Sequence, residues 1–131
     1  MPSYSLEEAT MLAGYIAVTV VAAIAYASAA VMNFTHNRSV IATAERLHVP
    51  VSWQVPLGVL LAAGSLGLLA GFAVPALGTA ASCGLVLYFT AAAGAHLRAH
   101  DTSLTAWLNW AAFFTLAIAA LAVGLADHGP L

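Results

Sequence analysis

The residue types that could do chemistry gather in two short polar stretches that interrupt an otherwise apolar chain. Four of the five histidines and all three arginines lie in or beside these stretches. The candidate catalytic residues are Glu45, His96, Arg98 and Asp101. Carboxylates and imidazoles transfer protons, and a guanidinium binds an anion or orients a polar group. We expect Asp101 or Glu45 to be the acid or base, His96 to transfer a proton and Arg98 to orient the substrate. The alternative is that these charges form ion pairs, such as Arg98 with Glu45, that only hold the loops together.

Further residues of the same stretches are candidates for contact with a substrate: Asn33, His36, Arg46, Trp107 and Trp110. In this hypothesis the substrate is a lipophilic small molecule that enters from the bilayer and undergoes isomerisation, epoxide or ring opening, or cyclisation. Two other chemistries stay open. His36 and His96 end two apolar runs on the same side and could together ligate haem b. His96 and His100 could bind a metal ion only with a third ligand, such as Asp101 or His36. We assign no metal and no cofactor from the sequence.

The composition places this chemistry in a membrane. Of the 131 residues, 63% are hydrophobic and 6% are charged, against about 25% charged in an ordinary soluble domain. So few charges cannot cover a water-exposed surface, which excludes a soluble enzyme, a disordered regulator and a nucleic-acid-binding protein. The single cysteine, Cys83, excludes a dithiol relay within one chain. The sequence therefore predicts an integral membrane protein with the lipid bilayer as its first partner.

Four apolar runs are long enough to cross the bilayer, which takes about 20 residues in a helix. They cover residues of about 9–34, 51–73, 75–95 and 104–126. Together they leave no room for a soluble module, so residues 1–131 are predicted to form a single all-α domain, a four-helix transmembrane bundle. The short joint at Pro75, which suits a first helical position, predicts that the middle two spans form an antiparallel hairpin. Their small residues, Gly67 with Gly71 and Ala80 with Gly84, predict close helix contacts.

The segment between the first two spans is predicted to be a short amphipathic helix at the membrane surface. Apolar residues recur at helical spacing over 39–48, with Ser39 as the expected N-cap and Pro50 as the stop. All three arginines lie in the two loops on this side, which the positive-inside rule assigns to the cytoplasm. We therefore expect a multi-pass protein of the cell membrane with both termini non-cytoplasmic, and we expect a homo-oligomer.

Several of these residues resemble the DoxX-like family of small four-span membrane proteins. The hexapeptide His96-Leu97-Arg98-Ala99-His100-Asp101 is similar to the family's HLR-x-G-D ending of the third span, and the likeness extends roughly over 33–101. The resemblance implies a four-helix membrane bundle with His96, Arg98 and Asp101 at its polar end, and Arg46 in the preceding loop. Two residues depart from the pattern: His100 replaces a glycine, and Leu61 stands where we expect a glutamate.

The resemblance also implies a function, since relatives are linked to membrane redox systems, including quinone-coupled ones. Our first hypothesis is an accessory or redox-associated membrane subunit, with a membrane redox complex as its partner. The competing hypothesis is the membrane-embedded enzyme described above. Haem b or a quinone remains open as a cofactor, although Leu61 in place of a glutamate weakens a quinone or proton-relay role.

Overall fold

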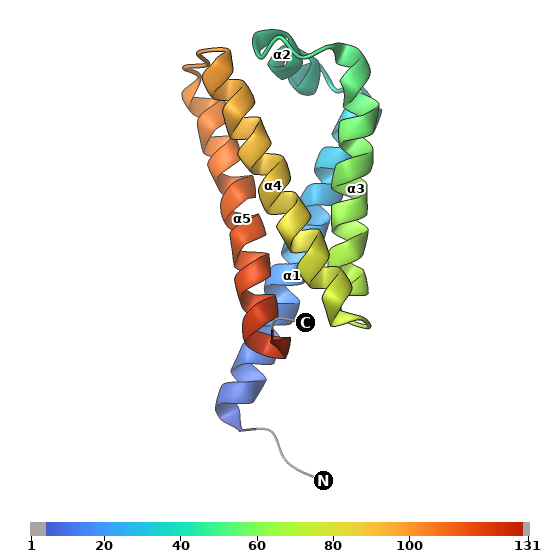
Figure 1. Ribbon diagram of the computed structural model, residues 1–131, viewed down its shortest axis with the longest axis vertical. Helices are drawn as coiled ribbons and strands as arrows, with labels where there is room; N and C mark the ends of the chain where they lie inside the picture. Colours follow the sequence, from blue (N-terminus) through green and yellow to red (C-terminus); the bar gives the residue numbers. More distant parts are fainter. Residues whose placement is uncertain (1–4, 130–131) are drawn as a thin grey trace.

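The computed structural model describes residues 5–129, and every regular element in that range is helical (Figure 1). The elements are α1 (Leu6–Phe34), α2 (Arg38–Arg46), the 3₁₀ turn η1 (Val51–Trp53), α3 (Gln54–Ala70), α4 (Pro75–Arg98) and α5 (Leu104–His128). The four long helices are apolar and long enough to cross a membrane. The predicted all-α membrane bundle is thereby confirmed.

The four spans contact one another in a ring: α1 packs on α3, α3 on α4, α4 on α5, and α5 on α1. They do not stay parallel. Figure 1 shows α3 and α4 close together at their shared turn and far apart at the other end, where α2 lies across the opening. We call the end with α2 the loop end; α1 begins and α5 finishes toward the opposite end. The divergence leaves space inside the loop end of the bundle.

The tight end of the bundle depends on glycines in the α3–α4 hairpin. A Cβ atom added to Gly71 would lie 2.7 Å from the Cα atom of Gly78, and one added to Gly67 would lie 2.7 Å from the Cβ atom of Ala81. The predicted contact at Gly67 and Gly71 is therefore present. The pair predicted on the next span is wrong, because a Cβ atom on Gly84 would meet nothing within 4 Å. Ala80 and Gly84 do have the four-residue spacing of a small-residue contact, but they lie on a face of α4 that is turned away from α3.

Within residues 5–129, three side chains of the spans donate hydrogen bonds to backbone carbonyls of a neighbouring span. The Tyr26 hydroxyl of α1 donates to the carbonyl oxygen of Phe113 in α5 (2.6 Å), and the Ser65 hydroxyl of α3 donates to that of Ala23 in α1 (2.7 Å). The indole N–H of Trp110 in α5 donates to the carbonyl oxygen of Phe89 in α4 (2.7 Å). The hydrophobic effect does not drive helices together in lipid, so such hydrogen bonds, along with close packing, help to fix which helices associate.

The predicted amphipathic segment is the helix α2. Its residue Ala44 and the following Leu47 are buried toward the bundle, while Arg38 and Glu45 are exposed and Arg46 reaches Asp101. The N-cap is Asn37, whose side-chain oxygen accepts the N–H of Ser39 at 3.0 Å, so the expected N-cap at Ser39 is wrong by two residues. Asparagine caps a helix at least as well as serine, because its carbonyl reaches the free backbone N–H groups of the first turn.

Candidate functional site

A tight turn after α4 brings the two central polar residues together. The backbone N–H of Asp101 returns to the carbonyl oxygen of His96 (2.9 Å), across His100 in the left-handed conformation (φ 53°). This is the hydrogen bond of a Schellman-type helix end, whose left-handed position favours glycine. The same type of turn ends α1 at His36 and α2 at His48, with φ of 52° and 56°. His100 thus occupies a position whose backbone suits the glycine of the family pattern.

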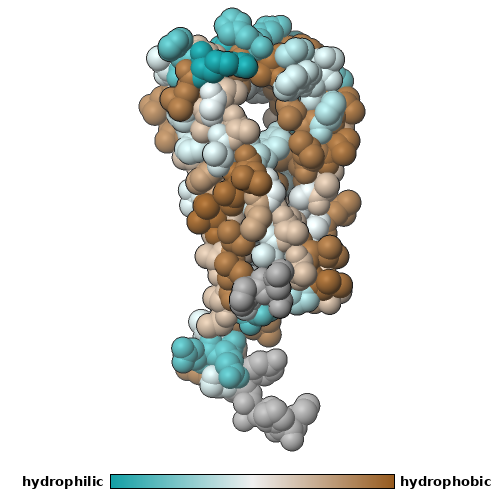
Figure 2. All heavy atoms as spheres, viewed as in Figure 1, coloured by the Kyte–Doolittle hydropathy of each residue, from teal (hydrophilic) through white to brown (hydrophobic). Residues whose placement is uncertain are grey.

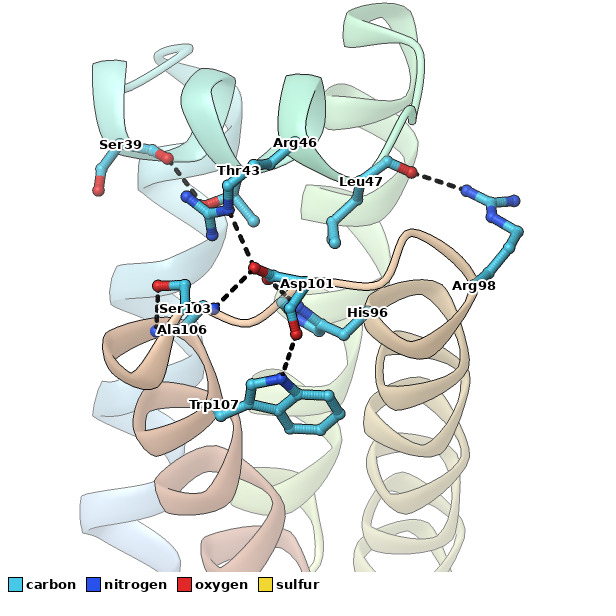
Figure 3. A network of polar contacts seen from close by, with 10 residues as sticks. All are labelled: Ser39, Thr43, Arg46, Leu47, His96, Arg98, Asp101, Ser103, Ala106 and Trp107. Carbon is cyan, nitrogen blue, oxygen red and sulfur yellow. Dashed lines mark hydrogen bonds and ion pairs between the residues drawn. The ribbon is translucent and has the colours of Figure 1, made fainter.

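The folded-back carboxylate of Asp101 forms the centre of a polar network (Figure 3). Its Oδ2 atom lies 2.7 Å from Nδ1 of His96, and both side chains are buried. Its Oδ1 atom accepts the backbone N–H of Ser103 at 3.0 Å and lies 3.4 Å from Nε of Arg46. The indole N–H of Trp107 donates to the backbone carbonyl oxygen of Asp101 at 2.8 Å. The network therefore joins α2, α4 and α5 at a single residue.

The protonation of the pair follows from these bonds. The hydrogen bond from the backbone N–H of Ser103, then that from His96, lower the pKa of the Asp101 carboxyl below 3.8, with Arg46 acting in the same direction. An ionised carboxylate can only accept hydrogen bonds, so Nδ1 of His96 must be the donor. In the neutral imidazole this leaves Nε2 of His96 without a proton, and Nε2 is then a proton acceptor. The Trp107 ring packs against the imidazole with the ring centroids 5.2 Å apart.

A cavity of about 290 Å³ lies within the loop end, at the divergence of the four spans and beneath α2. This volume is near the lower limit of small-molecule sites. Apolar side chains form most of its lining: Leu57, Leu61, Tyr88, Phe89, Trp110 and Phe113. The amides and the imidazole among its lining residues are those of Asn33, Gln54, His96 and Asn109. Figure 2 shows an opening at this level, just below the hydrophilic loop end and bordered by both apolar and more polar residues.

The predicted residues divide into three groups. His96, Asn33 and Trp110 line the cavity. Asp101, Arg46 and Trp107 do not line it and instead support the His96 side chain, directly or through Asp101. The third group, which lies outside the cavity lining, is Glu45, Arg98 and His36.

The proposed ion pair of Arg98 with Glu45 is not among the ion pairs found within residues 5–129. Arg98 instead donates from Nη2 to the carbonyl oxygen of Leu47 (2.8 Å), on the side of α4 that faces away from the network (Figure 3). The two arginines thus share one structural effect, because Arg46 and Arg98 both tie α2 to the turn between α4 and α5.

The two histidines considered for haem do not share the cavity, because His96 belongs to its lining and His36 does not. Within the described range 5–129, no three His, Cys, Asp or Glu residues are grouped as metal ligands.

Sequence reasoning missed Gln54, the first residue of α3. Its side chain is 1% exposed and lies in the cavity lining, and neither its Nε2 nor its Oε1 atom has a hydrogen-bond partner. Buried amides are almost always hydrogen-bonded, so this one requires an explanation. The available signal was its position, because Gln54 is the only glutamine and begins an apolar span. Leu61, where the family resemblance suggests a glutamate, lies in the same lining, so this position faces the site.

Comparison with known proteins gives one match. The sequence model of the DoxX-like family matches residues 17–124, a stretch that contains α2, α3, α4 and the whole polar network. No curated protein and no solved structure matches the chain. Because the match spans most of its length, including α3, α4 and large parts of α1 and α5, the chain belongs to the DoxX-like family of membrane proteins.

Proposed function

We propose that this DoxX-like protein is a membrane-embedded enzyme that performs acid–base chemistry on a lipophilic small molecule at the loop end of the bundle. The observation that supports this most is the 2.7 Å contact between Asp101 and His96, with His96 in the wall of a largely apolar cavity. A carboxylate–imidazole pair facing a cavity is a common arrangement for general acid–base catalysis.

Each member of the pair has a distinct role. Nε2 of His96 accepts a proton from a substrate carbon or hydroxyl group and returns it to another atom of the same molecule. Asp101 fixes the imidazole tautomer and stabilises the imidazolium while it holds the proton. Such a transfer needs no oxidant or reductant, which suits isomerisation, cyclisation or ring opening; opening an epoxide to a diol additionally consumes one water. Arg46 and Ser103 are positioning residues, because they contact Asp101.

Access from the bilayer supports a lipophilic substrate. The cavity lies between spans whose outer surfaces are apolar, and the opening in Figure 2 lies among them. A molecule dissolved in the lipid would reach His96 without crossing the polar loop end. Transfer of its apolar surface from lipid into an apolar cavity has little hydrophobic driving force, so specificity has to come from polar groups.

The second candidate function is an accessory, redox-associated membrane subunit. The observation that favours it is the joining of α2, α4 and α5 at Asp101, which could serve only to close the loop end. In that case the protein would act through a membrane complex and would bind no substrate of its own. A quinone in the cavity would connect the two candidates, since it is lipophilic and has carbonyl oxygens.

We further propose that the loop end faces the cytoplasm of a cell membrane, with both termini on the other side. All three basic side chains, Arg38, Arg46 and Arg98, belong to the loop end, as the positive-inside rule requires of a cytoplasmic face.

The test compares neutral-lipid extracts of cells that express the wild type, His96→Asn or His48→Asn, by untargeted mass spectrometry. His48 is an exposed histidine of the same end, outside the cavity lining, and asparagine tolerates its left-handed backbone, so it is the matched control. The proposal expects a compound that changes with the wild type and with His48→Asn but not with His96→Asn. Equal extracts from all three strains, with a set of membrane proteins co-purifying with every variant, would favour the accessory role instead.

A further inference from the structure

The unpartnered amide of Gln54 indicates what kind of molecule the cavity takes. We infer that Gln54 is a recognition residue that hydrogen-bonds the oxygen of an uncharged, lipid-soluble ketone or alcohol. This inference rests on the proposed binding site, but it concerns the substrate class rather than the reaction. Gln54 and His96 belong to α3 and α4, the two helices that diverge at the loop end, so they supply polar groups from two sides of one apolar space.

The burial of Gln54 is not explained by packing alone. Its side chain is among the largest fully buried ones, and both of its polar atoms lack a partner within the described structure. A buried amide without partners destabilises a protein, whereas an apolar side chain of the same shape would not. The packing around Gln54 therefore explains its size but not its amide. A rotation of the buried amide toward the adjoining cavity would let a ligand oxygen accept from Nε2 and supply the missing partner.

The cavity lining disfavours an ionic ligand group. Among the described residues that line the cavity there is no Asp, Glu, Lys or Arg, and the imidazole of His96 is already held by Asp101. A charged ligand group would be desolvated there without an opposite charge, which is strongly unfavourable. A carboxylic acid, an amine or a phosphate ester is therefore a poor fit. A neutral carbonyl accepts from the amide, and a neutral hydroxyl can both accept from it and donate to it.

The size of the cavity favours a compact ligand. At about 290 Å³ it is small for a ligand site, and most of its lining is apolar. One polar group on a compact hydrocarbon body matches this arrangement better than a molecule with several polar groups. Gln54 would then fix the oxygen, and the hydrocarbon body would lie against the cavity-lining residues Phe89, Phe113 and Trp110.

The experiment uses three probes of nearly equal size: cyclododecane, cyclododecanone and cyclododecanol. Their binding to the full chain in nanodiscs is measured by saturation-transfer NMR, with the wild type and with Gln54→Met, which keeps the length of the side chain and removes its amide. A net hydrogen bond corresponds to a factor of about 2–10 in affinity. We expect the wild type to bind the ketone and the alcohol more tightly than the hydrocarbon by that factor, and Gln54→Met to bind all three equally.

The unfolding temperature of each variant without a probe provides a second readout. Gln54→Met is expected to be at least as stable as the wild type, because it removes an unpaired buried amide. A clear loss of stability would show that the amide is paired within the protein and would overturn the inference. If the preference for the oxygen compounds persists in Gln54→Met, Gln54 is not the recognition residue, although the binding site stands. If none of the probes binds the wild type, the proposed site and this inference both fail.

Discussion

The glycine contact holds the tight end of the α3–α4 hairpin, opposite the end where the two helices diverge, and Gly71→Ala tests this contact directly. The added Cβ atom would lie 2.7 Å from the Cα atom of Gly78 and 3.1 Å from its nitrogen. Carbon atoms in favourable contact are about 3.5–4.0 Å apart, so the helices must separate by about 1 Å. Both atoms belong to the backbone, and no side-chain rotation can relieve the clash.

The expected cost is about 1–3 kcal/mol, the range observed for an overpacked methyl group. Backbone conformation does not add to it, because Gly71 has φ −61° and ψ −21°, which alanine adopts readily. Gly84→Ala is the matched control, since the added methyl group there meets nothing within 4 Å. Replacing a helical glycine by alanine gains up to about 1 kcal/mol, so this control is expected to be neutral or stabilising.

The assay is reversible unfolding in mixed micelles of a mild detergent and sodium dodecyl sulfate, followed by circular dichroism. Gly71→Ala should unfold at a lower dodecyl sulfate fraction than the wild type, and Gly84→Ala should not. If Gly71→Ala is as stable as the wild type, the close approach at Gly78 does not hold the hairpin.

Three further predictions concern the loop end. His100→Gly should raise the free energy of unfolding by about 1 kcal/mol, because the left-handed backbone strains a histidine but not a glycine. The same mixed-micelle titration measures it, and a loss of stability would contradict the strain. The pKa of Asp101 is lower in the folded protein than the ordinary 3.8, so its ionised form contributes stability that is fully present above pH 3.8 and is lost as the pH falls through the lower folded value. The stability difference between the wild type and Asp101→Asn should therefore shrink when the pH is lowered below 3.8. A difference that stays constant with pH would refute this prediction. A reporter that is active only outside the cytoplasm should be active when fused after residue 131 and inactive when inserted in the α4–α5 turn, and the reverse pattern would invert the proposed orientation.

The apolar runs were sufficient to predict the four spans, because lipid requires helices of a certain length and hydropathy. The number of spans also predicted that the polar groups gather at one end, because the first and third loops of a four-span protein lie on the same side of the membrane. Helix geometry explains part of what was missed. Residues two apart on a helix point about 200° from each other, so His96 and Arg98 could not both face one cavity.

The grouping of His96 with Asp101 was expected, but their direct contact was not. It depends on the turn at His100, where a histidine adopts the left-handed backbone of a position that is glycine in the family pattern. The burial of Gln54 depends on how the helices pack at the loop end, which the apolar pattern of the sequence does not specify. Both features arise from tertiary packing, and a single sequence without a structure does not reveal them.

The proposed function and the inference about Gln54 both require that the cavity beside His96 holds a neutral lipophilic molecule. Mass spectrometry of an organic extract from the purified protein in native-membrane nanodiscs measures this for the wild type, Ala92→Phe and Ala91→Phe. Ala92 lines the cavity, and its neighbour Ala91 is exposed on the outer surface of the same helix. We expect a compound in near-equal amount to the wild type and to Ala91→Phe, and its absence from folded Ala92→Phe. An extract that contains no such compound, or one that Ala92→Phe leaves unchanged, would contradict an occupied cavity.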